Sequence, residues 1–214
     1  MNSKANNSES VESLTDSADY LHQTDVNLIQ QYVAGDLVAF ETLYNRHKGG
    51  LYRYFMRHIS DTGLAEDLYQ EIWSKVVVQA KHYKPTAKFT TWLYTLAHNK
   101  LVDHVRHLSV VNKVVVNHDS EVAEGQDTFE VQKMGNESES ELISSRVGDA
   151  LKQCIGQLPQ VQKDSFLLKE EAGLSVKEIA LVLNTSFEAS KSRLRYAYEN
   201  LRQCIHVKTG RAVA

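Results

Sequence analysis

Three histidines and an aspartate near the middle of the chain are residue types that a metal-dependent hydrolase would use. They are His98, Asp103, His104 and His107. On a helix, His104 and His107 would share a face, whereas His98 and Asp103 point elsewhere. A catalytic zinc site needs three converging protein ligands. The spacing therefore favours histidines that face solvent or nucleic acid, and we expect no metal site and no cofactor.

The adjacent carboxylates Glu66 and Asp67 could in principle form an acid–base pair. Adjacent residues on a helix point about 100° apart, so the two carboxylates do not converge on one substrate atom. We expect no catalytic residues and no enzymatic activity. Acids in the first turns of a helix complement its dipole, and they can also form a docking face for another protein. The residues of that predicted docking face are Asp67, Gln70 and Glu71.

The last long stretch of the chain offers a different chemistry, the recognition of nucleic acid. Its hydroxyl, basic and aromatic side chains lie opposite or beside an apolar stripe on one helix. Ser and Arg hydrogen-bond to base edges, and Lys and Arg bind phosphates. An ordinary amphipathic helix with a solvated basic face, which binds no nucleic acid, would show the same pattern of residues. The predicted DNA-contacting residues are Glu188, Lys191, Ser192, Arg193, Arg195, Tyr196 and Arg202.

Two helices joined by a tight turn are predicted to position that face. Ser175 is a suitable N-cap for the first, and Glu178 can complete a capping box. The polar segment 184–186 favours a turn, and the second helix is predicted over about residues 187–206. Its buried stripe is predicted to be Ser190, Leu194, Ala197, Leu201 and Ile205.

A second group of basic and aromatic residues lies earlier in the chain. It spans a loop and the helix that follows it, predicted over residues 90–107. Exposed aromatics interleaved with basic residues suit single-stranded DNA, because unstacked bases need a ring and the backbone needs a cation. We expect Phe89 and Trp92 to be core residues, and the sequence leaves Tyr83 and Tyr94 open between core and stacking roles. The predicted contacts to DNA here are Tyr83, Lys84, Lys88, Tyr94, His98, Asn99 and Arg106.

The helical periodicity predicts an all-α fold of two small domains, over residues 25–107 and 141–206, the second ending in a helix-turn-helix. The polar segment 1–24 is predicted to be a disordered tail, and 207–214 a second tail. The acidic segment 108–140 is predicted to be a flexible linker whose residues 111–117 are extended. A kink is expected in the first domain at Gly49 and Gly50.

Composition and charge narrow the class of protein further. The chain has 214 residues and a net charge of −3, but the segments 26–107 and 141–214, which overlap the two predicted domains, each carry +3. A basic domain surface is the expected footprint of a nucleic-acid binder. No membrane-spanning apolar run or signal peptide is found, so we expect a cytoplasmic protein without membrane insertion. Cys154 and Cys204 are far apart, and we expect two buried free thiols.

Five blocks of sequence resemble the extracytoplasmic-function (ECF) type of sigma-70 family sigma factors. They are AFETLYNRH, AEDLYQEIW, FTTWLYTLAHNKLVDHVR, LPQVQKDSFLLKEEAGLSVKEIA and SKSRLRYAYENLR, in this order. The resemblance covers about residues 25–107 and 141–205.

This resemblance implies a bacterial transcription initiation factor whose partners are core RNA polymerase, promoter DNA and an anti-sigma factor. Asp67, Gln70 and Glu71 would dock on core polymerase. The segment from Tyr83 to Arg106 would open and read the −10 element, and the helix-turn-helix would read the −35 element as duplex. Around Glu188 and Tyr196 the chain departs from the usual family pattern, so the promoter sequence does not carry over. The alternative is a helix-turn-helix regulator that acts without core polymerase.

Overall fold

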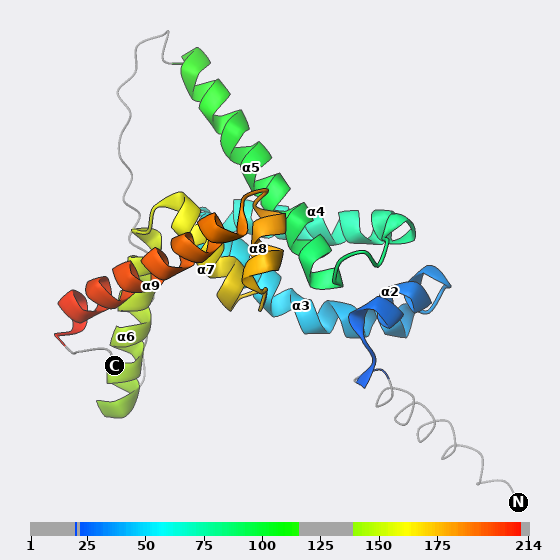
Figure 1. Cartoon of the computed structure of the whole chain (residues 1–214), viewed down its shortest axis with the longest axis horizontal. Helices are drawn as coiled ribbons and strands as arrows, with labels where there is room; N and C mark the ends of the chain where they lie inside the picture. The colour runs from blue at the N-terminus through cyan, green and yellow to red at the C-terminus, as the bar shows by residue number, and fades with distance from the viewer. Residues whose placement is uncertain (1–19, 21, 116–138, 211–214) are drawn as a thin grey trace, which may run out of the picture.

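The structure, a computed structural model, describes residue 20, residues 22–115 and residues 139–210. Every regular element within these ranges is helical, which confirms the predicted all-α fold (Figure 1). The predicted N-terminal tail and linker lie largely outside the described residues. None of the described helices combines the length and apolar character needed to cross a membrane. The elements are α2 (Asp25–Val33), α3 (Leu37–His58), α4 (Thr62–Gln79), the short η1 (Ala80–His82), α5 (Phe89–Val115), α6 (Glu139–Gly156), α7 (Gln160–Glu170), α8 (Val176–Val182) and α9 (Phe187–Thr209).

Side-chain caps set where the first helices begin. Thr24, Asp36 and Asp61 each accept a hydrogen bond from a backbone N–H in the first turn of α2, α3 and α4. Such caps satisfy amide groups that have no partner within the helix. Asp25 does not cap α2 but is its first helical residue. Its carboxylate instead forms an ion pair with Arg46 of α3 at 2.8 Å.

Aromatic side chains fill the space between α3 and α4 in the N-terminal domain. The rings of Phe40 and Tyr44 meet Trp73 edge-on, with centroids 6.2 and 4.8 Å apart. Deeper in the core, Tyr54 of α3 meets Tyr94 of α5 at 5.4 Å. Edge-to-face pairs of this kind add to the stabilisation from apolar burial. They fix α5 against α3, and α5 carries most of the residues predicted to contact the −10 DNA.

The kink that we expected at Gly49 and Gly50 is absent, since α3 runs unbroken from Leu37 to His58. Glycine in a helix interior costs about 1 kcal/mol relative to alanine. The structure gives Gly50 a packing role, because a Cβ there would lie 2.4 Å from the backbone carbonyl oxygen of Glu171. The backbone of the C-terminal domain therefore approaches α3 at Gly50, where α3 has no side chain to prevent it.

Helix α5 ends later than we predicted. It continues through residues 108–115, so residues 111–115 are helical and the expected extended conformation is wrong there. Neither glycine nor proline occurs between Leu101 and Val115. Adding one residue to an existing helix needs no new nucleation, so valines of modest helix propensity can continue it. Figure 1 shows this end of α5 projecting beyond the neighbouring helices.

The C-terminal domain contains the helix-turn-helix that we predicted. Ser175 and Glu178 form the expected capping box at the start of α8. Ser186 caps α9, and between the two helices Asn184 adopts a left-handed backbone conformation with φ 46°. Asparagine tolerates this region better than most residues. The predicted stripe of α9 is confirmed, with four residues buried and Ile205 partly buried. The four are Ser190, Leu194, Ala197 and Leu201.

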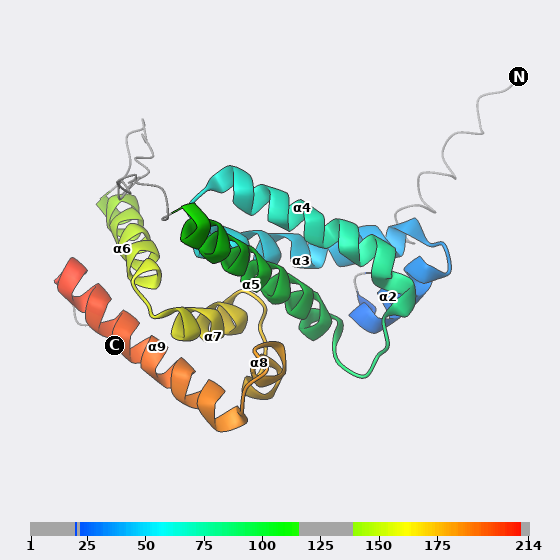
Figure 2. The same cartoon turned by 90° about the horizontal axis from the view of Figure 1, so that it is seen from above.

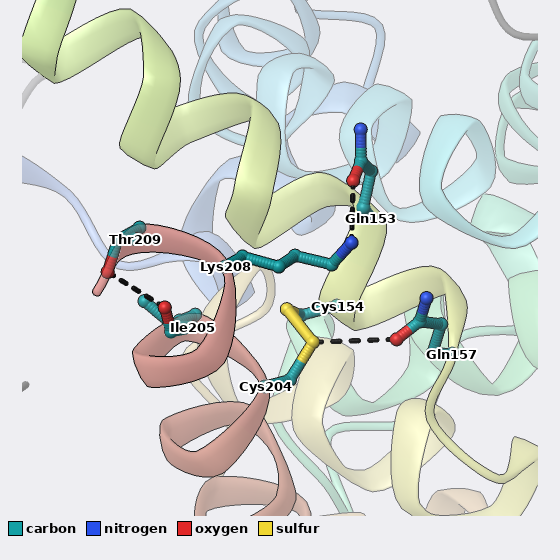
Figure 3. Close-up of a disulfide and its surroundings, with 7 residues drawn as sticks. All are labelled: Gln153, Cys154, Gln157, Cys204, Ile205, Lys208 and Thr209. Atoms are coloured by element: carbon teal, nitrogen blue, oxygen red, sulfur yellow. Dashed lines mark hydrogen bonds between the residues drawn. A yellow bond between two sulfur atoms is a disulfide. The ribbon is translucent and has the colours of Figure 1, made fainter. Parts of the chain in front are cut away.

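The prediction of two free thiols is wrong. Cys154 of α6 and Cys204 of α9 form a disulfide whose partners are 50 residues apart in sequence (Figure 3). Their Cα atoms lie 5.8 Å apart, a distance that a disulfide spans readily. Beside it, Lys208 donates a hydrogen bond to the side chain of Gln153 at 2.9 Å. The end of α9 is thus attached to α6 by a covalent bond and a polar contact.

Candidate nucleic-acid interface

Helix α9 presents a polar face that is not used in packing. Arg193 is half-buried, and the other residues predicted to contact duplex DNA are exposed. The guanidinium of Arg195 lies over the ring of Tyr196, 4.5 Å from its centroid. This cation–π contact limits the conformations of both side chains before any DNA is bound. The exposed members of the face are Glu188, Lys191, Ser192, Arg195, Tyr196 and Arg202.

Helix α9 is also held in place by side chains that lie beside this face. Tyr198 donates a hydrogen bond to Glu170 of α7, and Asn200 donates one to Gln162 at 2.8 Å. The ring of Tyr198 also meets Phe166 at 5.5 Å. A recognition helix must be rigidly oriented if its side chains are to meet base edges in register. The helices α7 and α8 supply that support for α9.

The loop before α5 holds its aromatics in a compact arrangement. The ring of Tyr83 lies 5.2 Å from Trp92 and 6.1 Å from Phe89, and its hydroxyl donates a hydrogen bond to the carbonyl of Ala87 at 2.8 Å. Phe89 is buried, as predicted, and Trp92 and Tyr83 are half-buried. The cations Lys84 and Lys88 project from the same loop and are exposed. The loop therefore combines partly accessible rings with cations.

Two of the residues predicted to face DNA from α5 are turned inward. Tyr94 is 1% exposed, so of the core and stacking roles that the sequence left open it has the core role, and burial raises the pKa of its hydroxyl. His98 is half-buried beside the hydroxyl of Tyr54 at 3.3 Å, and burial lowers the pKa of its imidazole. Asn99 and Arg106 are exposed on the same helix.

The acidic face predicted on α4 is present as a surface. Asp67 and Gln70 are exposed, and Glu71 is half-buried. Residues at spacings of three and four lie on one side of a helix. Glu71 also pairs with Lys100 of α5 at 2.7 Å, which joins this face to the helix predicted to read the −10 element.

The structure gives the histidines of α5 no shared site. Among the residues that the structure describes, three or more His, Cys, Asp or Glu side chains are nowhere arranged to hold a metal ion. His104 is half-buried and His107 is exposed.

Sequence reasoning missed a group of charged residues that joins the two domains. Arg53 and Arg57 of α3 both contact Glu171, at 2.6 and 2.8 Å, and His58 contacts Asp164 of α7 at 2.8 Å. The spacing of Arg53 and Arg57 places them on one face of α3, and this was the only local sequence feature that pointed to a shared acidic partner. Their partners lie more than 100 positions later in the chain, where no local pattern connects them.

Comparison with known proteins shows that both halves of the chain match regions of one protein family. Residues 43–110 match the family profile for Sigma-70 region 2, and residues 148–201 match that for Sigma-70, region 4. The ECF RNA polymerase sigma factor SigW of Bacillus subtilis is 29% identical over 178 residues, covering 82% of this chain and 93% of SigW. SigK of Mycobacterium tuberculosis, also named an ECF RNA polymerase sigma factor, is 27% identical over 186 residues, covering 86% of this chain and 95% of SigK.

Solved structures share the fold. The sigma factor RpoE of Bartonella quintana, in complex with the anti-sigma factor NepR, superposes with a TM-score of 0.60 at 18% identity, covering 78% of this chain and 97% of RpoE. CnrH, in complex with the cytosolic domain of CnrY, superposes with a TM-score of 0.58 at 20% identity, covering 86% of this chain and 99% of CnrH.

Proposed function

Because the chain belongs to the sigma-70 family of transcription initiation factors, in its ECF group, we propose that it binds core RNA polymerase and directs it to selected promoters. The observation that carries this proposal is the division of α9 into a buried stripe and an exposed polar face. A helix that is docked on one side and offers Ser, Arg and Tyr on the other suits the major groove of duplex DNA. In this proposal α9 reads the −35 element.

The −10 element would be read by the loop before α5 and by α5 itself. Lys84 and Lys88 would bind the backbone of the melted strand, and Tyr83 and Asn99 would contact bases. Extruding a base costs a few kcal/mol, which stacking and hydrogen bonds must offset. The proposal needs no catalytic group in this chain, because the polymerase performs the chemistry.

The acidic face of α4 is the proposed docking site for core polymerase. Core would hold the two DNA-binding domains at the spacing of the promoter elements, so that two weak contacts act as one strong contact. An anti-sigma factor is a further proposed partner, since the structurally similar RpoE was solved with one. A factor that acts on polymerase and promoter DNA would work in the cytoplasm.

Run-off transcription tests the proposal. Purified core polymerase is supplied with genomic fragments, with and without this protein. We expect discrete transcripts that start only when both proteins are present. If the protein binds fragments alone and never redirects core, the regulator that acts without polymerase replaces this proposal.

Replacing Arg195 with alanine should weaken −35 recognition by about 1–3 kcal/mol and relax selectivity at one base position. The guanidinium is exposed and held over Tyr196, where it can form a bidentate contact to guanine. Arg195→Lys keeps the charge without the planar fork, so it should recover phosphate attraction but not selectivity. Competition run-off assays on promoters with single −35 substitutions measure this. Unchanged selectivity in both variants would remove Arg195 from the reading face.

Replacing Asp67 or Gln70 with alanine should weaken binding to core polymerase while leaving the fold intact. Both side chains are exposed and make no packing contribution to the domain core. Glu41→Ala is a matched control, because it removes an exposed acid from a different helix, α3. Titration of labelled protein with core measures the affinity. An affinity for core equal to that of the control in both variants would exclude α4 as the docking face.

A further inference from the structure

Arg46 of α3 fastens the residues that lead into the first helix of the N-terminal domain. Its guanidinium donates hydrogen bonds to the carbonyl oxygens of Tyr20 and Gln23, at 2.9 and 2.7 Å. It also forms the ion pair with Asp25 at 2.8 Å. The hydroxyl of Tyr20 donates a further hydrogen bond to Asp36, the N-cap of α3, at 2.6 Å. The chain is therefore attached to α3 at several points before α2 begins and at its first residue.

The Asp25 carboxylate holds a second residue of α3 with its other oxygen, which lies 2.8 Å from Nε2 of His47. Because a carboxylate only accepts hydrogen bonds, Nε2 carries the hydrogen and donates it. Burial alone would raise the pKa of the Asp25 carboxyl, but the hydrogen bonds and charges of His47 and Arg46 outweigh it and lower that pKa. The carboxyl is therefore ionised. A hydrogen bond to an ionised group is stronger than a neutral one, and this one fixes the orientation of the imidazole ring.

The other side of the His47 ring supports the loop before α5. Its centroid lies 5.3 Å from that of Phe89, which is buried at the start of α5 and packs in turn on Tyr83. Burial and, second to it, the charge of Asp25 raise the pKa of the Tyr83 hydroxyl, so this carboxylate lies within electrostatic reach of the loop. Figure 2 shows α2 beside the turn between α4 and α5, and α2 contacts η1 in that turn. A continuous series of contacts thus leads from Asp25 to Tyr83.

The match to the Sigma-70 region 2 profile begins at residue 43, so it gives Asp25 no role. His47 and Phe89 lie within the matched residues, and Asp25 contacts them from outside. Side chains that read a ligand need a second set of residues that locks their orientation. The position of Asp25, one residue removed from the ring that supports the loop, is that of such a residue.

We propose that Asp25 is a positioning residue for the −10 element, and that it acts through His47 on the packing of Tyr83. What the loop reads rests on the proposed function, whereas the positioning of the loop rests on the contacts alone. Without the carboxylate the imidazole ring would be free to turn, and Phe89 would lose the fixed surface on which it packs. Tyr83 would then sample several orientations, and only a fraction of them would suit a base of the melted strand.

Two substitutions of Asp25 and a matched control test the positioning. Asp25→Ala removes both contacts of the carboxylate. Asp25→Asn keeps the size of the side chain and removes its charge, so it should cause a smaller change in the same direction and serves if Asp25→Ala fails to fold. Glu41→Ala is the control, because it removes an exposed acid from α3.

A double-mutant cycle tests the route through His47. If Asp25 acts by orienting this ring, His47→Ala should already cause the full effect. Adding Asp25→Ala to His47→Ala should then change nothing further, because the two side chains act as one unit.

Tryptophan fluorescence reports the loop in the full-length protein. Trp92 is half-buried with its ring 5.2 Å from Tyr83, whereas Trp73, the other tryptophan of the chain, is only 7% exposed. Quenching by acrylamide therefore measures mainly the accessibility of Trp92. We expect Asp25→Ala to increase quenching and to shift the emission to longer wavelength. The thermal midpoint should change little, since partly exposed ion pairs contribute little net stability.

DNA binding is measured with the complex of this protein and core polymerase. The probes are a labelled single strand carrying the −10 element of a promoter defined by run-off transcription, and a labelled duplex carrying its −35 element. If the loop of Asp25→Ala keeps the binding orientation for about a tenth of the time, fluorescence anisotropy should show about tenfold weaker binding of the single strand. Binding of the −35 duplex should stay unchanged, and Glu41→Ala should resemble the wild type with both probes.

Each contrary result overturns a different part of the proposal. Unchanged quenching in both Asp25 variants would overturn the positioning of the loop. Increased quenching with unchanged binding of the single strand would overturn the role in reading the −10 element. Equal weakening at both promoter elements would reduce Asp25 to a structural contact, and additive losses in the double variant would overturn the route through His47. If Asp25→Ala increases quenching but the wild type never directs run-off transcription, the positioning stands and the proposed function fails.

Discussion

Replacing Cys204 with serine should lower the free energy of unfolding of the C-terminal domain by about 2–4 kcal/mol. The disulfide with Cys154 closes a loop between residues that are 50 apart in sequence, and this restricts the unfolded chain. Cys154→Ser should have the same effect. A reductant should lower the stability of the wild type but leave both variants unchanged.

Chemical denaturation followed by circular dichroism measures the loss, and tryptophan fluorescence supplies an internal control. The only two tryptophans of the chain, Trp73 and Trp92, belong to the N-terminal domain. Their transition should move little when the disulfide is removed. Wild-type protein that is equally stable with and without reductant, after mass spectrometry has shown the disulfide to be formed and then reduced, would contradict the prediction.

Replacing Leu167 with alanine should destabilise the C-terminal domain by about 2–5 kcal/mol. Leu167 is 0% exposed in the middle of α7, so the loss of its side chain leaves a cavity between helices. Leu181→Ala is the matched control, because Leu181 is 67% exposed on α8 and should change stability by about 0.5 kcal/mol or less. Chemical denaturation followed by circular dichroism gives the free energy of unfolding of each variant. Similar losses in both variants would mean that α7 is not the centre of this domain.

The parts of the structure that sequence predicts well are those in which neighbouring residues determine the outcome. The capping box of Ser175 and Glu178 and the buried stripe of α9 follow from spacings within one or two turns. The same holds for the exposure of Asp67, Gln70 and Arg195. Each depends on helical periodicity or on a hydrogen bond between residues close in sequence, and a linear pattern contains that information.

The features that were missed depend on partners far away in the chain. Tyr94 is turned inward because its ring packs on Tyr54 and its hydroxyl donates a hydrogen bond to the carbonyl of Glu171. Neither residue is its neighbour in sequence. The pairing of Cys154 with Cys204 needs α6 and α9 to lie side by side. Gly50 was read as a weak point in α3, because the backbone that fills the space beside it belongs to the other domain. The extension of α5 was missed because β-branched residues were weighed by propensity alone.

The disulfide also determines what a protease would leave behind. A single cut in the turn between α7 and α8, or in that between α8 and α9, lies within the covalent loop from Cys154 to Cys204. The two fragments would stay joined and would migrate together on a denaturing gel until a thiol was added. Limited proteolysis of a cell extract, run with and without reductant, therefore reports whether this bond is formed in the organism.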